Sequence, residues 1–190
     1  MDRRQLERRP AAYAYQRGVL AIPGGLLAIV FALGNWRVLG DLVVLAALVL
    51  FGGAWYAIDH AYRRRYGRMT PTQARDLRAL AAGAAGVAVI VAGSLLLQSR
   101  ASWSLDLPVN AIAVTCPIAF VAFHAAGGAL RAHHLIVWGA VLVAGLLPIW
   151  HGPPDPGNVA LVMCGAASIL CGVLDHLAFT RLFSAPALDG

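Results

Sequence analysis

The chain has 190 residues, of which 59% are hydrophobic and 13% are charged, and its mean hydropathy is +0.69. Soluble domains usually contain about a quarter charged residues, so this composition excludes an ordinary soluble domain and indicates an integral membrane protein. All 15 basic residues are Arg. The absence of Lys excludes any mechanism that needs a lysine Schiff base, such as attachment of retinal or pyridoxal phosphate.

Long apolar runs follow one another along the chain. A helix needs about 20 residues to cross the hydrocarbon core of a bilayer, which is about 30 Å thick. Six runs approach this length, and they are residues 18–34, 38–58, 79–98, 109–130, 135–150 and 158–179. A transmembrane barrel is disfavoured because the runs do not alternate between apolar and polar residues. The sequence therefore predicts an all-α fold, an integral membrane bundle of six transmembrane helices paired as three in-out-in hairpins.

The distribution of Arg predicts the orientation of this bundle. If the N-terminus lies inside, 13 of the 15 Arg residues fall on the inner side, and only Arg37 and Arg100 fall outside. By the positive-inside rule, both termini are expected in the cytoplasm and the protein in the plasma (cell inner) membrane. We therefore expect the net charge of +6 to favour contact with anionic lipids at the cytoplasmic face, and we do not take it as a sign of nucleic-acid binding. Interface aromatics are expected at Trp36, Trp103 and Trp150 outside and at Tyr56, Tyr62 and Tyr66 inside.

Outside the transmembrane domain at 18–179, we expect an Arg-rich cytoplasmic segment at 1–17 and a cytoplasmic tail at 180–190. The connection 59–78 is predicted to extend the second and third helices as a cytoplasmic hairpin. Gly67 is placed to end the first of these helices, and Thr70 begins the second as its N-cap. Its basic side chains are candidates for binding lipid or a partner, and they are Arg63, Arg64, Arg65, Arg68, Arg75 and Arg78.

A short internal repeat is visible in the second half of the chain. Asn110 precedes Cys116 by the same spacing as Asn158 precedes Cys164, and each Asn closely follows a Pro. A repeat of this kind predicts hairpins of similar orientation, as in membrane proteins built from parallel repeats. Matches this short also arise by chance in apolar sequences, so the repeat stays a hypothesis.

Polar residues inside the predicted spans form a first candidate site. Cys164, Ser168, Cys171 and Asp175 share one stripe of the last span, because their spacing follows the helical period. The stripe predicts either close helix packing, for which small residues are suited, or a polar track that lines a cavity together with His124. His124 lies well inside its span without a predicted partner at its depth, which disfavours a haem held by two His residues.

A second candidate site lies at the inner edge, where polar residues end several spans. Asp59, His60, His133, His134 and His176, together with Asp175, offer ligands that suit Zn²⁺ or a similar ion. The pattern HExxH does not occur, and His residues at a membrane interface also occur without a ligand. We therefore predict no cofactor, while a metal or haem remains an alternative. Arg131 is the expected partner of Asp175.

Signatures of membrane enzymes, including Walker A and GxGxxG, do not occur, which favours a non-enzymatic protein. The leading hypothesis is an accessory or sensory membrane subunit that acts through helix packing, with itself or another membrane protein, and through its basic cytoplasmic loop. Small residues on the third span, at Ala79, Ala82, Gly83 and Gly86, favour such packing. The alternatives are a small transporter or permease subunit that uses His124 and the 164–175 stripe, and a redox protein that binds a metal or haem.

Overall fold

The computed structural model describes residues 18–66, 109–126, 130–147 and 155–184, together with 81, 85, 86, 88, 92, 93 and 150. This part of the chain is all-helical and contains no strand, which confirms the all-α part of the predicted fold. A single 3-10 turn, η1 (Gly18–Leu20), precedes five α-helices. These are α2 (Ala21–Asn35), α3 (Asp41–Tyr66), α5 (Ala111–Ala126), α6 (Ala132–Leu146) and α7 (Pro156–Ser184).

Within the described ranges, three segments are long and apolar enough to cross a membrane, namely Gly18–Asn35, Asp41–Tyr62 and Pro156–Arg181. Helices α5 and α6 are also apolar but have only 16 and 15 residues. At a rise of 1.5 Å per residue, they extend over about 23 Å, which is less than the hydrocarbon core. The structure thus supports membrane-spanning helices, while six spans and the orientation of the termini stay predictions. Most of span 79–98 and of the hairpin extension at 59–78 lies outside the described residues.

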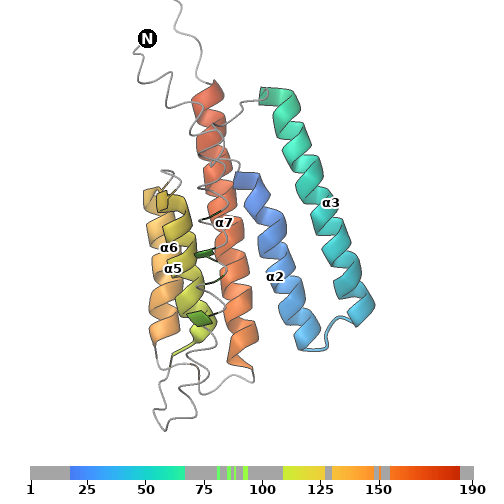
Figure 1. Cartoon of the computed structure of the whole chain (residues 1–190), viewed down its shortest axis with the longest axis vertical. Coiled ribbons are helices and arrows are strands. Elements are labelled where there is room, and N and C mark those ends of the chain that lie inside the picture. Colours follow the sequence, from blue (N-terminus) through green and yellow to red (C-terminus); the bar gives the residue numbers. More distant parts are fainter. Residues whose placement is uncertain are drawn as a thin grey trace, which may run out of the picture.

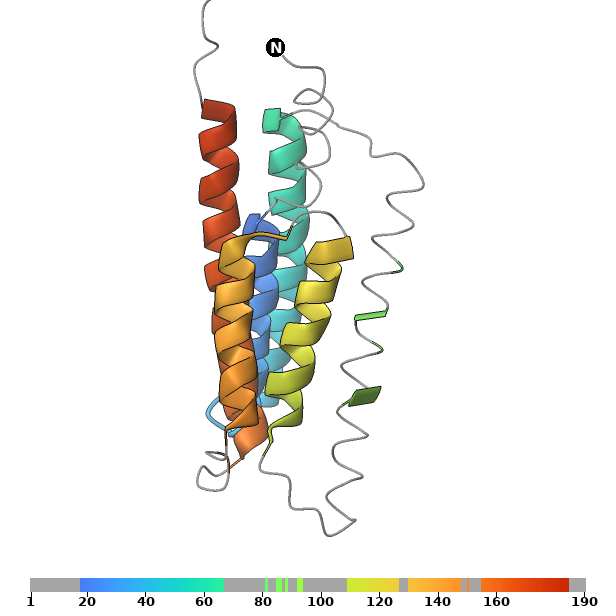
Figure 2. The ribbon, with the colours of Figure 1, turned by 90° about the vertical axis from the view of Figure 1, so that its left-hand side faces the viewer.

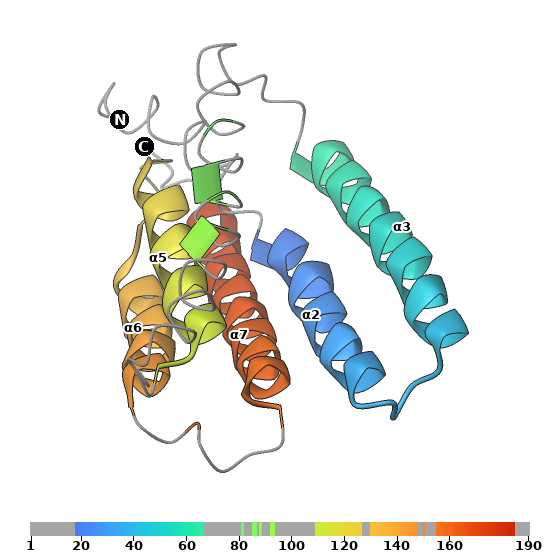
Figure 3. The ribbon, with the colours of Figure 1, turned by 60° about the horizontal axis from the view of Figure 1, so that its bottom comes forward.

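Helix α7 lies at the centre of the molecule, because it packs against α2 on one side and against α5 and α6 on the other (Figure 1). Helices α3, α5 and α7 run in one direction and α2 and α6 in the other, and α3 lies at the edge, beyond α2 (Figure 1, Figure 2). Figure 2 shows α5 and α6 side by side in front of the α2 and α3 pair. Seen from another angle in Figure 3, α5, α6 and α7 form one group, from which α3 is farthest.

Two pairs of glycines bring α7 and the α2 segment into direct backbone contact. Gly25 faces Gly165, and Gly18 faces Gly172, in an antiparallel register. A Cβ atom built on Gly165 would lie only 2.5 Å from the carbonyl oxygen of Gly25. Glycine is needed here for close approach, as in other tightly packed membrane helices.

Helices α5 and α6 form a hairpin whose contacts are symmetric about residue 129. Phe120 stacks on Trp138 with ring centroids 4.5 Å apart. Farther from the connection, a Cβ on Gly145 would lie 2.8 Å from the backbone of Ala113. In each pair, the two residues are equally far in sequence from residue 129, so one register holds along the whole hairpin. Trp138 and Ala113 belong to the buried core that α5 and α6 share with α7.

The described residues of span 79–98 are helical and pack on α5. A Cβ built on Gly93 would lie 2.5 Å from Cγ2 of Thr115, and one on Gly86 would lie 3.7 Å from Cβ of Ala119. Gly86 is one of the small residues predicted to favour association between membrane proteins, but it packs against α5 of the same chain. Gly86 serves an internal contact.

The two asparagines of the predicted repeat lie near the starts of α5 and α7. Asn110 caps α5, because its Oδ1 accepts hydrogen bonds from the backbone N–H groups of Ile112 and Ala113, each at 3.1 Å. Asn158 lies in the first turn of α7, and its Oδ1 accepts a hydrogen bond of 2.9 Å from Asn35. Both asparagines are buried at the same end of the bundle. Asn110 precedes its helix whereas Asn158 is the third residue of its own, so the repeat stays a hypothesis.

Some elements differ from their predicted boundaries and surroundings. Helix α6 begins at Ala132, before the predicted start at 135, so His133 and His134 belong to its first turn. Helix α3 ends at Tyr66, directly before the predicted end residue Gly67. Trp150 is buried, and its Nε1 donates to the carbonyl of Ala144 at 3.0 Å, while its place at the outer membrane interface stays a prediction. The indole thus closes the end of the core.

Candidate functional site

Asp175 is buried on α7, where two imidazoles and a guanidinium surround its carboxylate. The Nε2 of His133 lies 3.0 Å from its Oδ1, and the Nε2 of His134 lies 2.9 Å from its Oδ2. A carboxylate oxygen accepts, so both imidazoles donate. Nη1 of Arg131 lies 3.8 Å from Oδ1, which confirms the expected pairing of Arg131 with Asp175, although the imidazoles are nearer. A buried carboxylate requires such partners.

The first turn of α6 fixes the imidazole of His134. Arg131 is the N-cap residue, and its backbone N–H donates to Nδ1 of His134 at 3.2 Å. Because Nδ1 accepts, the ring proton is assigned to Nε2, from which it is donated to Asp175. Both ring nitrogens of His134 are therefore in use, and the ring has the orientation that the hydrogen bond to Asp175 requires.

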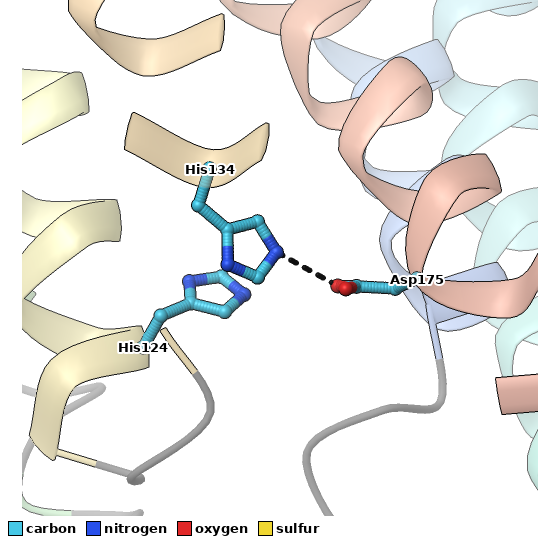
Figure 4. A group of neighbouring side chains, drawn as sticks. All are labelled: His124, His134 and Asp175. Atoms are coloured by element: carbon cyan, nitrogen blue, oxygen red, sulfur yellow. Dashed lines mark hydrogen bonds and ion pairs between the residues drawn. The ribbon is translucent and has the colours of Figure 1, made fainter. Parts of the chain in front are cut away.

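His124 lies on α5, and its imidazole packs on that of His134. The ring centroids are 4.1 Å apart, and the planes are tilted by 44° (Figure 4). Nδ1 of His124 lies 2.8 Å from the carbonyl oxygen of Phe120 and must donate to it. Nε2 consequently carries a lone pair. The expectation that His124 has no partner at its depth is thus wrong, because α6 starts early enough to place His134 beside it.

His124, His134 and Asp175 form a possible metal-binding group, since one ligand atom of each lies within 4.8 Å of the others. Figure 4 shows that they come from α5, α6 and α7, respectively. Ligands of a tetrahedral zinc ion lie about 3.4 Å apart, given bonds of about 2.0–2.1 Å. A small ion would therefore require the widest pair to approach by somewhat more than 1 Å.

The arrangement of the two rings bears on which group could bind here. A haem iron held between two imidazoles would need two metal–nitrogen bonds of about 2 Å each between the rings. Since the ring centroids of His124 and His134 are only 4.1 Å apart, a haem does not fit between them. His124 has the orientation typical of a metal ligand, because metal-bound imidazoles usually donate their other N–H to a carbonyl or carboxylate. Nδ1 of His134 instead accepts a hydrogen bond, so this ring must change its proton arrangement to bind an ion.

The other members of the predicted inner-edge cluster lie elsewhere. His176 is bound to the hydroxyl of Tyr62 at 2.5 Å, in a contact between α7 and α3. His60 is exposed on α3 and stacks on Tyr56, with ring centroids 6.3 Å apart. Asp59 is half-buried on the same helix. The structure thus brings only His133 and His134 of the predicted five to Asp175.

The predicted polar stripe of α7 separates into two parts. Ser168 donates from Oγ to the carbonyl of Ala21 at 3.3 Å, so it faces α2. Cys164 and Cys171 are buried in the core with α5 and α6, where the thiol of Cys164 neighbours that of Cys116. These three stripe residues serve helix packing, and Asp175 alone reaches the histidine cluster.

The basic loop is described in part. Arg64 is exposed on the last turns of α3, whereas the side chains of Arg63, Arg65, Arg68, Arg75 and Arg78 lie outside the described residues. A role of this loop in binding lipid or a partner remains a prediction. Comparisons with protein-family models, with curated proteins and with solved structures found no match for this chain.

Proposed function

We propose that the protein is a multi-pass membrane protein that binds a transition-metal ion of the Zn²⁺ class through His124, His134 and Asp175. The convergence of two imidazoles and a carboxylate from three helices within 4.8 Å supports this proposal. Neutral imidazole and carboxylate are ligands that zinc and similar ions accept. Of the three functions considered from the sequence, the metal-binding alternative gains most from this geometry.

The surroundings of the ligands favour a small ion. The carbonyl of Phe120 holds His124 so that its Nε2 lone pair is available. His133 already contacts Asp175 and can serve as a further ligand. Ion binding through Nε2 requires the ring proton of His134 to move to Nδ1 in place of the hydrogen bond from the backbone N–H of Arg131, because the ligand form of histidine is the neutral imidazole.

The cluster lies toward the end of the bundle at which α3 and α7 end (Figure 1). The apolar helices are compatible with a membrane protein. From the distribution of Arg, we propose that this end faces the cytoplasm of a cell whose plasma membrane holds the protein. The metal would then exchange with the cytoplasmic side.

Metal titration of the purified full-length chain in detergent tests the proposal. We expect Co²⁺ to give the visible absorption of a tetrahedral site, and Zn²⁺ to displace it, at one ion per chain. His124→Ala and Asp175→Asn should each weaken binding by at least about tenfold, as loss of a ligand or its support does elsewhere. His60→Ala is the matched control, because His60 is an exposed imidazole on α3, and it should bind as the unmodified protein does.

Two results would contradict the proposal. One is an unmodified protein that binds no ion above the level of the His124→Ala variant. The other is an equal loss in the His60→Ala control, which would indicate nonspecific binding to surface histidines. A separate measurement of thermal unfolding for each variant shows whether it is folded under the conditions of the titration.

The transporter alternative receives less support. It requires a polar path from His124 across the bundle, yet the next layer of the core contains Phe120 stacked on Trp138. An aromatic stack at this position occupies the space that such a path would use.

We also propose that the protein is non-enzymatic and has anionic lipids and a membrane protein or a second copy of itself as partners. The apolar surface of α3 supports this, since Leu42 and Val49 are 82% and 74% exposed and require lipid or another helix around them. Reversal of charge at Arg63–Arg65 should reduce recovery of the partner on co-purification without loss of the fold. Unchanged recovery would contradict a role for this loop.

A further inference from the structure

We infer that Arg131 competes with the metal ion for Asp175. The guanidinium compensates the charge of Asp175 in the metal-free protein and must move away when an ion binds. This inference rests on the proposed metal site. Arg131 begins α6, and its Nη1 lies 3.8 Å from Oδ1 of Asp175. That distance is too long for a hydrogen bond. The Nη1 atom is buried and has no hydrogen-bond partner among the residues that the structure describes.

This geometry differs from that of a structural ion pair. Arg and carboxylate usually form two parallel hydrogen bonds when the pair serves to hold elements together. Here His133 and His134 take those positions on the carboxylate of Asp175, and Arg131 contributes charge without a hydrogen bond. The guanidinium thus compensates the negative charge but does not fix the carboxylate.

A divalent ion bound to Asp175 would lie within a few ångströms of the same guanidinium. Arg stays protonated in proteins, so the repulsion persists at any working pH. Charges in a partly buried site interact more strongly than charges in water. The side chain of Arg131 is 23% exposed, and its flexible stem allows the charged group to move to the interface. Arg131 therefore weakens metal binding and favours release of the ion, which makes the site one of reversible exchange.

The experiment compares Zn²⁺ affinity in three full-length variants, measured by competition with a coloured chelator. Arg131→Met removes the charge but keeps the backbone N–H that holds His134, and it should raise the affinity by about tenfold or more. Arg131→Lys keeps the charge and should bind as the unmodified protein does. Arg181→Met is the matched control, since Arg181 is exposed on α7 about 9 Å along the helix from Asp175. Its charge is largely screened at this distance, so its affinity should change by less than about twofold.

A second measurement on metal-free protein separates failure of this inference from failure of the metal site. Thermal unfolding of Arg131→Met, Asp175→Asn and the double variant gives the coupling between the two side chains. We expect the Arg131 substitution to lower stability when Asp175 is present and to have little effect when Asn replaces it.

Unchanged or reduced Zn²⁺ affinity in Arg131→Met overturns the inference, as does the absence of coupling in the metal-free cycle. If coupling is present but the unmodified protein binds no Zn²⁺, the proposed function fails and Arg131 is only the charge partner of Asp175. Each combination of results therefore identifies which of the two statements is wrong.

Discussion

Substitution of Gly165 by Ala should separate α7 from α2. In the structure, a Cβ at this position would lie 2.5 Å from the carbonyl oxygen of Gly25 and 2.8 Å from Cγ1 of Ile29. Ordinary contacts of a Cβ begin at 3.4 Å. One obstacle is backbone, so a rotamer change cannot relieve it, and the two helices must move apart by about 1 Å.

The expected loss of stability follows from two opposing effects. Overpacking of a well-packed interface costs about 1–3 kcal/mol. Replacing Gly by Ala within a helix stabilises the helix by about 0.5–1 kcal/mol when space allows. The first effect is larger, so Gly165→Ala should lower the free energy of unfolding by about 1–2 kcal/mol. The hydrogen bond of 3.3 Å from Ser168 to Ala21, one turn away, would lengthen at the same time.

Reversible unfolding in mixed micelles, followed by circular dichroism, provides the assay. Gly52→Ala on α3 is the matched control, because a Cβ at Gly52 meets nothing within 4 Å. This control should be as stable as the unmodified protein or slightly more stable. Equal stability of Gly165→Ala and Gly52→Ala would refute the direct backbone contact between α2 and α7.

Three further substitutions test separate contacts. Asn110→Ala should lower the free energy of unfolding by about 1–2 kcal/mol in the same assay. It removes the cap of α5 and the hydrogen bond of 2.8 Å from Nδ2 to the carbonyl of Pro156. An unchanged stability would contradict the cap. Tyr62→Phe should lower stability by about 1 kcal/mol through loss of the hydrogen bond to His176, with unaltered helical content; a larger loss would indicate that the hydroxyl has further roles. Trp138→Phe should lower the free energy of unfolding by less than about 1.5 kcal/mol, since it keeps an aromatic ring and removes a buried Nε1 that has no hydrogen-bond partner among the described residues. A loss as large as that of Trp138→Ala would show that the indole N–H is hydrogen-bonded.

The five described α-helices each coincide with one of the apolar runs, because a long apolar run in a membrane protein predicts a helix. The apolar run began at 135, three residues after the observed start of α6, since His133 and His134 are polar. In fact His134 accepts the backbone N–H of Arg131 and so takes part in the cap. An imidazole that caps a helix is a local interaction that hydropathy does not record.

The composition of the site was predicted only in part, because it depends on the register between helices. His124 and His134 are equidistant from residue 129, as are Phe120 and Trp138. The short connection between the two predicted spans could have shown this symmetry and paired the two histidines. The position of Asp175 could not be derived in this way. It depends on how α7 rotates about its axis, which the contacts of Gly165 and Gly172 with α2 determine.

Stability alone does not account for the cluster around Asp175. Buried charged networks are often no more stable than apolar side chains of similar volume in the same place, although removal of one member leaves the others without partners. The hydrophobic core shared by α5, α6 and α7 contains aromatic, aliphatic and small residues such as Phe120, Trp138 and Ala167. Leu at position 175 would continue this packing without the desolvation that a carboxylate entails. Two imidazoles and a guanidinium around one carboxylate, with the imidazole of His124 packed on that of His134, are therefore in keeping with the proposed ligand site rather than with a purely structural role.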